Sequence, residues 1–174
     1  MLEALVFVVF TAALLWFSWP WLRDSRAHGF YRFFAWEFIL LLILLNYRRW
    51  FDDPFSPRQI VSWVLLLASI GLAAHGFYLL KTMGASQGAL ENTTALVTRG
   101  AYHYIRHPLY SSLLLFGWGT LLKDPSLPGL LLALALSVAL FATARVEEGE
   151  MVARFGASYT AYMRDTKRFI PFVF

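Results

Sequence analysis

The sequence predicts an all-α integral membrane protein with about five transmembrane helices. Hydrophobic residues make up 59% of the 174-residue chain and charged residues only 15%, against about 25% charged in a typical soluble domain. The apolar residues are gathered in long runs, and about 20 apolar residues are enough to cross the hydrocarbon core of a bilayer. The charged residues lie mainly in the stretches between those runs. These three observations place the chain in a membrane.

Five apolar runs are expected to span the membrane. The first has no positively charged segment before it, as a signal peptide would, so we interpret it as a span. Glu37 lies near the start of the second expected span and His75 near the end of the third. Residues 123–126 join the last two so tightly that they should form an antiparallel hairpin. Small residues should let helices approach closely: Gly71, Ala74, Gly117 and Gly119. The expected spans are residues 2–22, 33–47, 60–80, 109–122 and 127–143.

Composition narrows the range of possible functions. The chain has no cysteine, which excludes a disulfide framework, a thiolate metal site and a cysteine nucleophile. The net charge of +4 comes from basic residues dispersed in short loops, so we expect no nucleic-acid partner. We expect one membrane-embedded domain over residues 1–174. Its first 80 residues form three spans, and residues 81–174 form a polar loop, the hairpin and a charged tail.

Charge placement predicts the orientation of the spans. Eleven of the 15 basic residues fall in the loops after the first and third spans and in the tail. The positive-inside rule therefore places the N-terminus outside and these regions in the cytoplasm. The polar loop and the tail then lie on one face of the membrane and can meet.

Residues 96–110 form the longest polar and aromatic interval of the chain. They contain two of the four histidines, three tyrosines and two arginines. Pro108 suits the first turn of the helix expected to follow, where a missing N–H costs nothing. Cations and rings at a helix mouth suit a polar ligand with an anionic end. Because Pro108 opposes a regular helix through His103 and His107, we predict no metal site.

The tail begins with three carboxylates, at positions 147, 148 and 150, near the end of the last expected span. Taken alone, such a run is usually a solvated helix end. Carboxylates do not suit a helix C-terminus, so a longer helix or a bound cationic group would explain them better. Tyr159 and Tyr162 lie three residues apart and are expected to be interface anchors. The basic end of the chain is expected to lie on anionic lipid.

These motifs carry a resemblance. The pattern Leu-Val-x-x-Gly-x-Tyr-x-x-x-Arg-His-Pro-x-Tyr at 96–110 is followed by Glu-Glu at 147–148 and Phe-Gly-x-x-Tyr-x-x-Tyr at 155–162. Together they resemble the isoprenylcysteine carboxyl methyltransferase family, part of a wider group with phospholipid methyltransferases and NnrU-like proteins. The resemblance covers residues 87–171. It implies an S-adenosylmethionine-dependent methyltransferase with a cytoplasm-facing cofactor pocket. The implied cofactor contacts are Gln87, Thr94, Ala95, Leu96, Val97, Tyr102, His107, Pro108, Leu109, Tyr110 and Glu147.

The chemistry of S-adenosylmethionine suits these residues. Arg106 or backbone N–H groups at the helix mouth can bind its carboxylate, and Glu147 can bind its ammonium. Tyr102 or Tyr110 can offer a ring face to the sulfonium. Methyl transfer needs alignment and exclusion of water more than proton transfer. An amine or thiol acceptor would still need a base, for which Glu148, Glu37 and His107 are the candidates.

The acceptor is expected to be lipophilic and to enter from the bilayer: a prenylcysteine carboxylate, a lipid or a thiol. In the family an arginine thought to face the substrate carboxylate precedes the Glu-Glu pair, and here Thr143 takes its place. Arg145 is the candidate replacement, so Arg145 and Glu148 are the predicted catalytic residues. Two other functions stay open. One is an NADPH-dependent reductase of the sterol-reductase type, and the other is a non-enzymatic accessory protein that binds anionic lipid.

Overall fold

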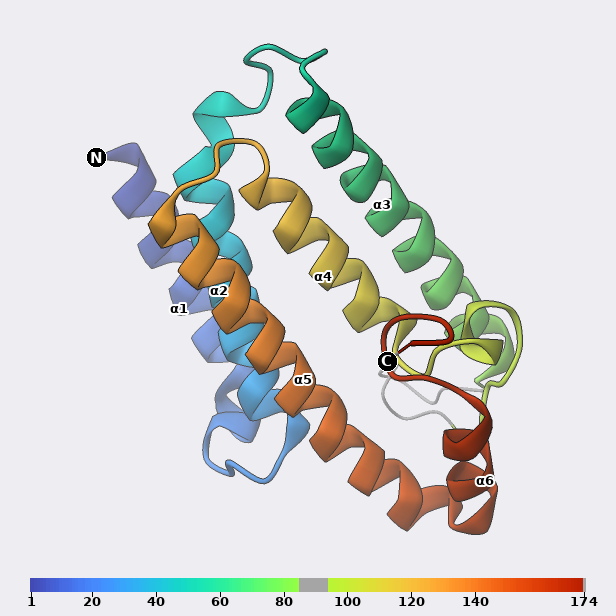
Figure 1. Cartoon of the computed structure of the whole chain (residues 1–174). Helices are drawn as coiled ribbons and strands as arrows, with labels where there is room; N and C mark the ends of the chain where they lie inside the picture. The colour runs from blue at the N-terminus through green and yellow to red at the C-terminus, as the bar shows by residue number, and fades with distance from the viewer. Residues whose placement is uncertain (85–93, 174) are drawn as a thin grey trace. The chain divides into compact units, whose positions relative to one another are not determined.

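The computed structural model describes residues 1–84 and 94–173, and it confirms the all-helical prediction (Figure 1). The helices are α1 (Leu2–Leu22), α2 (His28–Asn46), α3 (Pro57–Met83), α4 (Pro108–Leu121), α5 (Leu127–Phe155) and α6 (Ala157–Asp165). Two short 3-10 helices add to these, η1 (Tyr47–Arg49) and η2 (Gly100–His103). Within the described ranges, β pairing is limited to one isolated bridge.

Four stretches of helix in the described ranges are long and apolar enough to cross a membrane. They are α1, α2 together with η1, α3 and α5. The fourth expected span does form a helix, α4, but its 14 residues extend only about 21 Å at 1.5 Å per residue. This is shorter than a hydrocarbon core of about 30 Å.

Three helices, α2, α3 and α5, are longer than their expected apolar runs. Helix α2 begins at His28, before the expected start at 33, which makes Glu37 its central residue rather than one near its end. Helix α5 continues past the expected end at 143 to Phe155. The carboxylates of the tail therefore lie on a helix that outlasts its apolar part, one of the two explanations considered above.

The chain divides into two compact units. The first unit comprises residues 1–66 and 114–147, and the second comprises residues 67–113 and 148–174. Helices α3, α4 and α5 each contribute to both. The boundary in α5 falls between Glu147 and Glu148.

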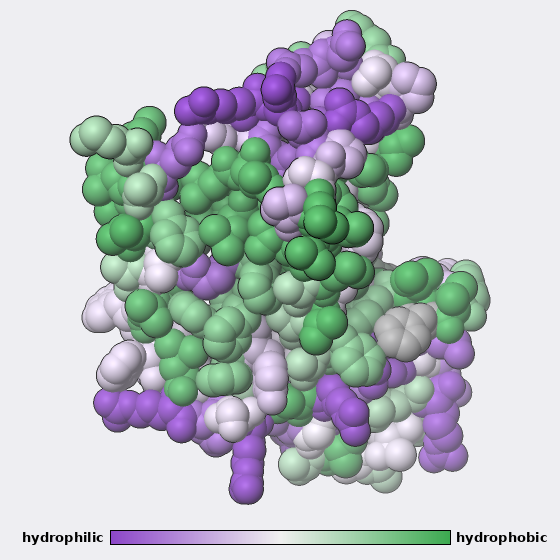
Figure 2. Space-filling model, turned by 60° about the vertical axis from the view of Figure 1, so that its left-hand side comes forward, coloured by the Kyte–Doolittle hydropathy of each residue, from purple (hydrophilic) through white to green (hydrophobic). Residues whose placement is uncertain are grey.

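In the first unit, α1 runs along α2. The hydroxyl of Thr11 donates to Oε2 of Glu37 at 3.0 Å, and the side chains of Tyr47 and Arg48 donate to Oε1 of Glu3 at 2.8 and 2.7 Å. Most other side chains of α1 are exposed and apolar. Figure 2 shows apolar residues over much of the face that it draws. Exposed apolar side chains on a helix of this length are what a lipid-facing span requires.

The expected hairpin of α4 and α5 is also present in the first unit. The indole N–H of Trp118 donates to Oγ of Ser137 at 3.2 Å, which joins the two helices. Helix α3 is joined to α4 because Ser62 donates to the carbonyl of Gly119 at 2.6 Å.

Two of the small residues explain this close packing. A Cβ atom at Gly119 would lie 3.1 Å from Cγ of Leu66, and one at Gly117 would lie 2.2 Å from Cδ2 of Leu136. The same expectation is wrong for Gly71, because in the described chain no atom outside its chain neighbours and the nearby backbone of its own helix lies within 4 Å of the position that its Cβ would take.

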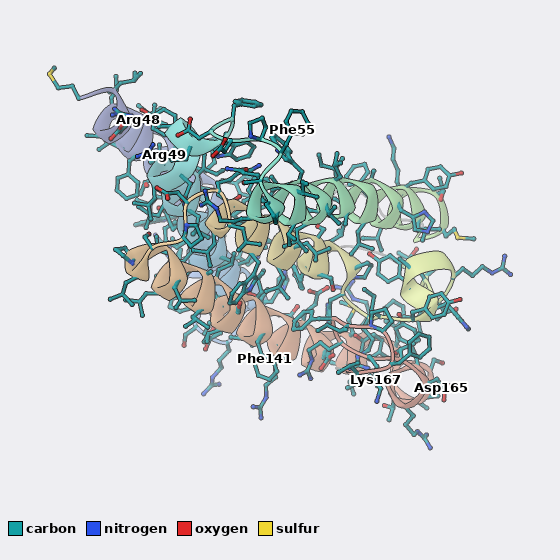
Figure 3. The ribbon with its side chains drawn as sticks, turned by 45° about the horizontal axis from the view of Figure 1, so that its top comes forward. Arg48, Arg49, Phe55, Phe141, Asp165 and Lys167 are labelled. Atoms are coloured by element: carbon teal, nitrogen blue, oxygen red, sulfur yellow. The ribbon has the colours of Figure 1, made fainter. Side chains whose placement is uncertain are left out.

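Lys123 lies in the turn between α4 and α5, but its side chain is fully buried instead of being exposed to solvent. Its Nζ donates to Oε1 of Gln59 at 3.0 Å and lies 3.3 Å from the ring centroid of Trp63. Burial, and then the charge of Arg58, lowers the pKa of Lys123. Gln59 in turn donates to the backbone carbonyls of Arg49 and Lys123. These hydrogen bonds join the start of α3 to the end of η1 and to the turn that follows α4. Figure 3 labels Arg48 and Arg49 of η1.

Candidate active site

In the second unit, the residues just before the polar interval are hydrogen-bonded to the backbone at the end of α3. Thr94 and Ala95 donate their N–H groups to the carbonyl of Gly84 at 3.0 and 3.2 Å, next to the end of α3. Val97 and Tyr102 are buried against Leu79 of α3. Their side chains therefore help to hold the interval on α3.

Gly100 opens η2 in a conformation that other residues rarely adopt. Its φ is +59°, and a Cβ there would lie 2.7 Å from Nε2 of His75. Both facts require glycine at this position. The glycine of the motif therefore sets the path of the chain toward His107.

The residues just before α4 pair with the end of the chain. We call residues 166–169 the strap. Ile105 and Lys167 form a parallel bridge, in which Arg106 donates its N–H to the Lys167 carbonyl at 2.7 Å and Lys167 donates to the Tyr104 carbonyl at 3.1 Å. His107 donates to the Arg168 carbonyl at 3.1 Å. Figure 3 labels Asp165, the last residue of α6, and Lys167 just beyond it.

A side chain on α4 adds to the pairing. The hydroxyl of Ser111 donates to the carbonyl of Phe169 at 2.9 Å. The polar interval and the tail, expected to lie on one face of the membrane and meet, are thus in direct contact within this unit.

Helix α6 presents its two tyrosines to the protein rather than to an interface. Tyr159 and Tyr162 are buried, with ring centroids 5.7 Å apart in an edge-to-face arrangement. The hydroxyl of Tyr162 donates to the carbonyl of Tyr102 at 2.6 Å. Burial raises the pKa of the Tyr162 phenol above its ordinary value. The expectation of interface anchors is wrong, because this contact satisfies the hydroxyl inside the unit.

A buried carboxylate stands at the centre of the site. Nε of Arg106 donates to Oε1 of Glu148 at 2.8 Å, and Nη2 of Arg168 donates to Oε2 at 2.6 Å. Nε of Arg168 also donates to Oε1, at 3.1 Å. The exposed fractions of the side chains are 5% for Glu148, 9% for Arg106 and 19% for Arg168. We call Arg106, His107, Glu148 and Arg168 the Glu148 cluster.

Arg106 is held on several sides. Besides Glu148, its Nη1 donates to the backbone carbonyls of Met163 and Thr166. These bonds link the start of α4 to the end of α6. Because the guanidinium is engaged with the protein, we interpret Arg106 as a structural centre of the cluster. The basic residue Arg168 likewise pairs with Glu148 rather than pointing to lipid, contrary to the expectation for the tail.

His107 completes the cluster. Its side chain is buried, its ring stacks on Tyr110 with centroids 5.4 Å apart, and its Nε2 lies 3.4 Å from Oε1 of Glu148. A carboxylate beside an imidazole can fix the orientation of the ring and stabilise its protonated form. This arrangement can accept a proton from a nearby acidic group.

The other predicted residues are distributed as follows. Gln87 lies outside the described residues. Thr94 is exposed, Ala95, Leu96, Leu109 and Tyr110 are partly buried, and Pro108 is buried as the first residue of α4. Arg145 is exposed and Glu147 is partly buried, and both belong to the first unit, so their roles stay predictions. Thr143 is buried and donates to the carbonyl of Ala139 within its own helix.

Sequence reasoning missed three contributors: Arg168 as the partner of Glu148, Ser111, and the strap backbone. No local spacing links residues 106, 148 and 168, and a backbone pairing leaves no trace in side-chain chemistry. In the described residues, no group of three His, Asp or Glu side chains could hold a metal ion.

Comparison with known proteins assigns the chain to a family. The model of the phospholipid methyltransferase family matches residues 57–158, more than half of the chain. The chain belongs to the phospholipid methyltransferase family. The matched region includes α3, α4, α5 and most of the residues described above. The methyltransferases of this family use S-adenosylmethionine as their methyl donor.

One curated relative is methanethiol S-methyltransferase 2 of Bradyrhizobium diazoefficiens, 30% identical over 118 residues. The match covers 66% of this chain and 44% of that relative, so the chain spans less than half of the relative's length in this match. No solved structure matches the chain. The wider family group is confirmed, and the narrower isoprenylcysteine group stays a prediction.

The residues present fit the methyl donor of the family. Two guanidiniums and one carboxylate leave the Glu148 cluster with an excess positive charge at the start of α4, which suits a carboxylate. The stacked rings of His107 and Tyr110 suit a flat base or a sulfonium.

Proposed function

We propose that this protein is a membrane methyltransferase that uses S-adenosylmethionine. The observation that carries the proposal is the Glu148 cluster, which joins motif residues about 40 positions apart and is closed by the strap. Within the described part of the chain, residues 94–97, Tyr102 and 107–110 would contact the donor, and Glu147 would bind its ammonium. When bound, the donor supplies an electrophilic methyl group.

We propose a small thiol as the acceptor. The relative named above acts on methanethiol, and the site contains an imidazole–carboxylate pair that a thiol needs. The thiol sulfur forms a bond to the methyl carbon, the bond from that carbon to the sulfonium sulfur breaks, and its electron pair stays on that sulfur. The thiol proton passes to the imidazole of His107, whose Nε2 lies beside the Glu148 carboxylate that stabilises the ring.

Other acceptors are weaker candidates on this evidence. A prenylcysteine carboxylate needs no base, but Thr143 here bonds its own helix and Arg145 is exposed in the first unit. Family membership favours a methyltransferase over an NADPH-dependent reductase. If the protein were a non-enzymatic accessory protein, it would have the Glu148 cluster but would transfer no methyl group.

The test uses the full chain in lipid vesicles with S-adenosylmethionine carrying a labelled methyl group. Methanethiol, phosphatidylethanolamine and a farnesylcysteine derivative are offered in separate reactions. We expect labelled dimethyl sulfide from methanethiol, and we expect His107→Ala to lower its rate about a hundredfold, as for loss of a general base. If label appeared only in the phospholipid or only in the farnesylcysteine, that compound rather than a thiol would be the methyl acceptor. No transfer to any of the three would contradict the proposed activity.

A further inference from the structure

The Glu148 carboxylate is held by a residue at the far end of the chain. We propose that Arg168 is a positioning residue that fixes Glu148 against His107, so that one side chain of the C-terminal strap, that of Arg168, is a working part of the active site. This inference rests on the proposed function. It assigns to the tail a role other than anchoring the protein to lipid.

Arg168 has the geometry for this role. It donates from two nitrogens to the two oxygens of Glu148, at 2.6 and 3.1 Å, and such two-point contacts fix a carboxylate in position and in rotation. The bond to Glu148 also raises the pKa of the Arg168 guanidinium. Glu148 in turn lies 3.4 Å from His107. The chain of contact therefore runs from Arg168 through Glu148 to the imidazole.

The backbone holds Arg168 where its side chain is needed. Its carbonyl accepts the N–H of His107 at 3.1 Å, and the Lys167 carbonyl before it accepts the N–H of Arg106 at 2.7 Å. The residue that positions Glu148 is thereby tied by its own backbone to His107. A lipid anchor would not need this double connection.

Lys167 offers a matched control. It precedes Arg168, carries the same charge and takes part in the strap through its backbone, but its side chain is exposed. We expect loss of the Lys167 charge to leave the strap pairing and the Glu148 cluster in place, because only the backbone of this residue takes part in them. A general effect of tail charge on lipid binding would affect both residues alike.

The experiment is a double-mutant cycle in vesicles, with methanethiol turnover and calorimetric affinity for S-adenosylhomocysteine as the two readouts. We expect Arg168→Gln to lower kcat about tenfold or more through misplacement of the base, and Lys167→Gln to change it less than about twofold. Arg168→Lys, which keeps the charge but not the two-point contact, should lose about threefold. It tests the same claim if Arg168→Gln does not fold.

The cycle separates positioning from general support of the fold. In a Glu148→Gln background, Arg168→Gln should change both readouts less than about twofold, because its partner is already altered. Independent, multiplying losses would overturn the inference, and so would equal behaviour of Arg168→Gln and Lys167→Gln in an active protein. An inactive wild-type protein that does not bind S-adenosylhomocysteine would contradict the proposed function itself.

Discussion

Glu148 shows how this site keeps a charge buried. Removing a carboxylate from water costs several kcal/mol unless partners and hydrogen bonds replace the solvent. Here two guanidiniums bind its two oxygens, and backbone carbonyls take further donors of Arg106. Loss of one arginine would leave a buried oxygen of Glu148 without its charged donor, which is why substitutions in this cluster should affect function and folding together.

Tyr162 allows a cleaner test of the contact between α6 and the polar interval. Tyr162→Phe removes the hydrogen bond to the Tyr102 carbonyl and leaves that acceptor buried without it, so we expect a loss of about 1–2 kcal/mol in stability. Thermal unfolding in detergent, followed by tryptophan fluorescence, measures the change. As a control, Tyr104→Phe also removes a phenol hydroxyl, but from an exposed ring, and should have little effect. Equal losses in the two variants would argue against the contact.

At the scale of single residues, sequence reasoning identified those whose chemistry is local. Pro108 begins α4 as predicted, and His107 is in the cluster. Tyr162 was misjudged because a tyrosine near a membrane is equally suited to an interface and to a buried hydrogen bond. Arg168 was missed because only the folded path of the strap brings it to Glu148.

Secondary-structure elements were predictable where they are apolar. Every expected apolar run is a helix, because a membrane span must satisfy its own backbone hydrogen bonds. Helix boundaries were less predictable: α5 continues through charged residues to Phe155, where hydropathy gives no signal. The pairing of the strap with residues 104–107 involves backbone groups, which carry no sequence signature.

The packing of α3 on α4 gives a prediction at this scale. Gly119→Val would add side-chain atoms where Leu66 and Leu65 already lie at contact distance, and the crowding should cost about 1–3 kcal/mol. Gly71→Val introduces the same side chain where the described chain leaves open space, and should be tolerated. Thermal unfolding of the two variants side by side measures the difference. A stable Gly119→Val would mean that this contact is looser than described.

For the whole molecule, the charge distribution predicts an orientation that the fold does not test. Because the chain has no cysteine, single cysteines can report it without interference. A cysteine at position 165 should be protected from a membrane-impermeant maleimide in intact cells, and one at position 124 should be labelled. The reverse pattern would place the candidate active site outside.

The family assignment and the Glu148 cluster both predict that the whole protein binds S-adenosylmethionine. The most direct measurement is a calorimetric titration of S-adenosylhomocysteine into the detergent-purified full chain, beside Glu147→Gln and Lys167→Gln. We predict saturable binding to the wild type and to Lys167→Gln, weakened about tenfold or more in Glu147→Gln, equivalent to at least about 1.4 kcal/mol. A folded wild-type protein that binds no S-adenosylhomocysteine would contradict the account.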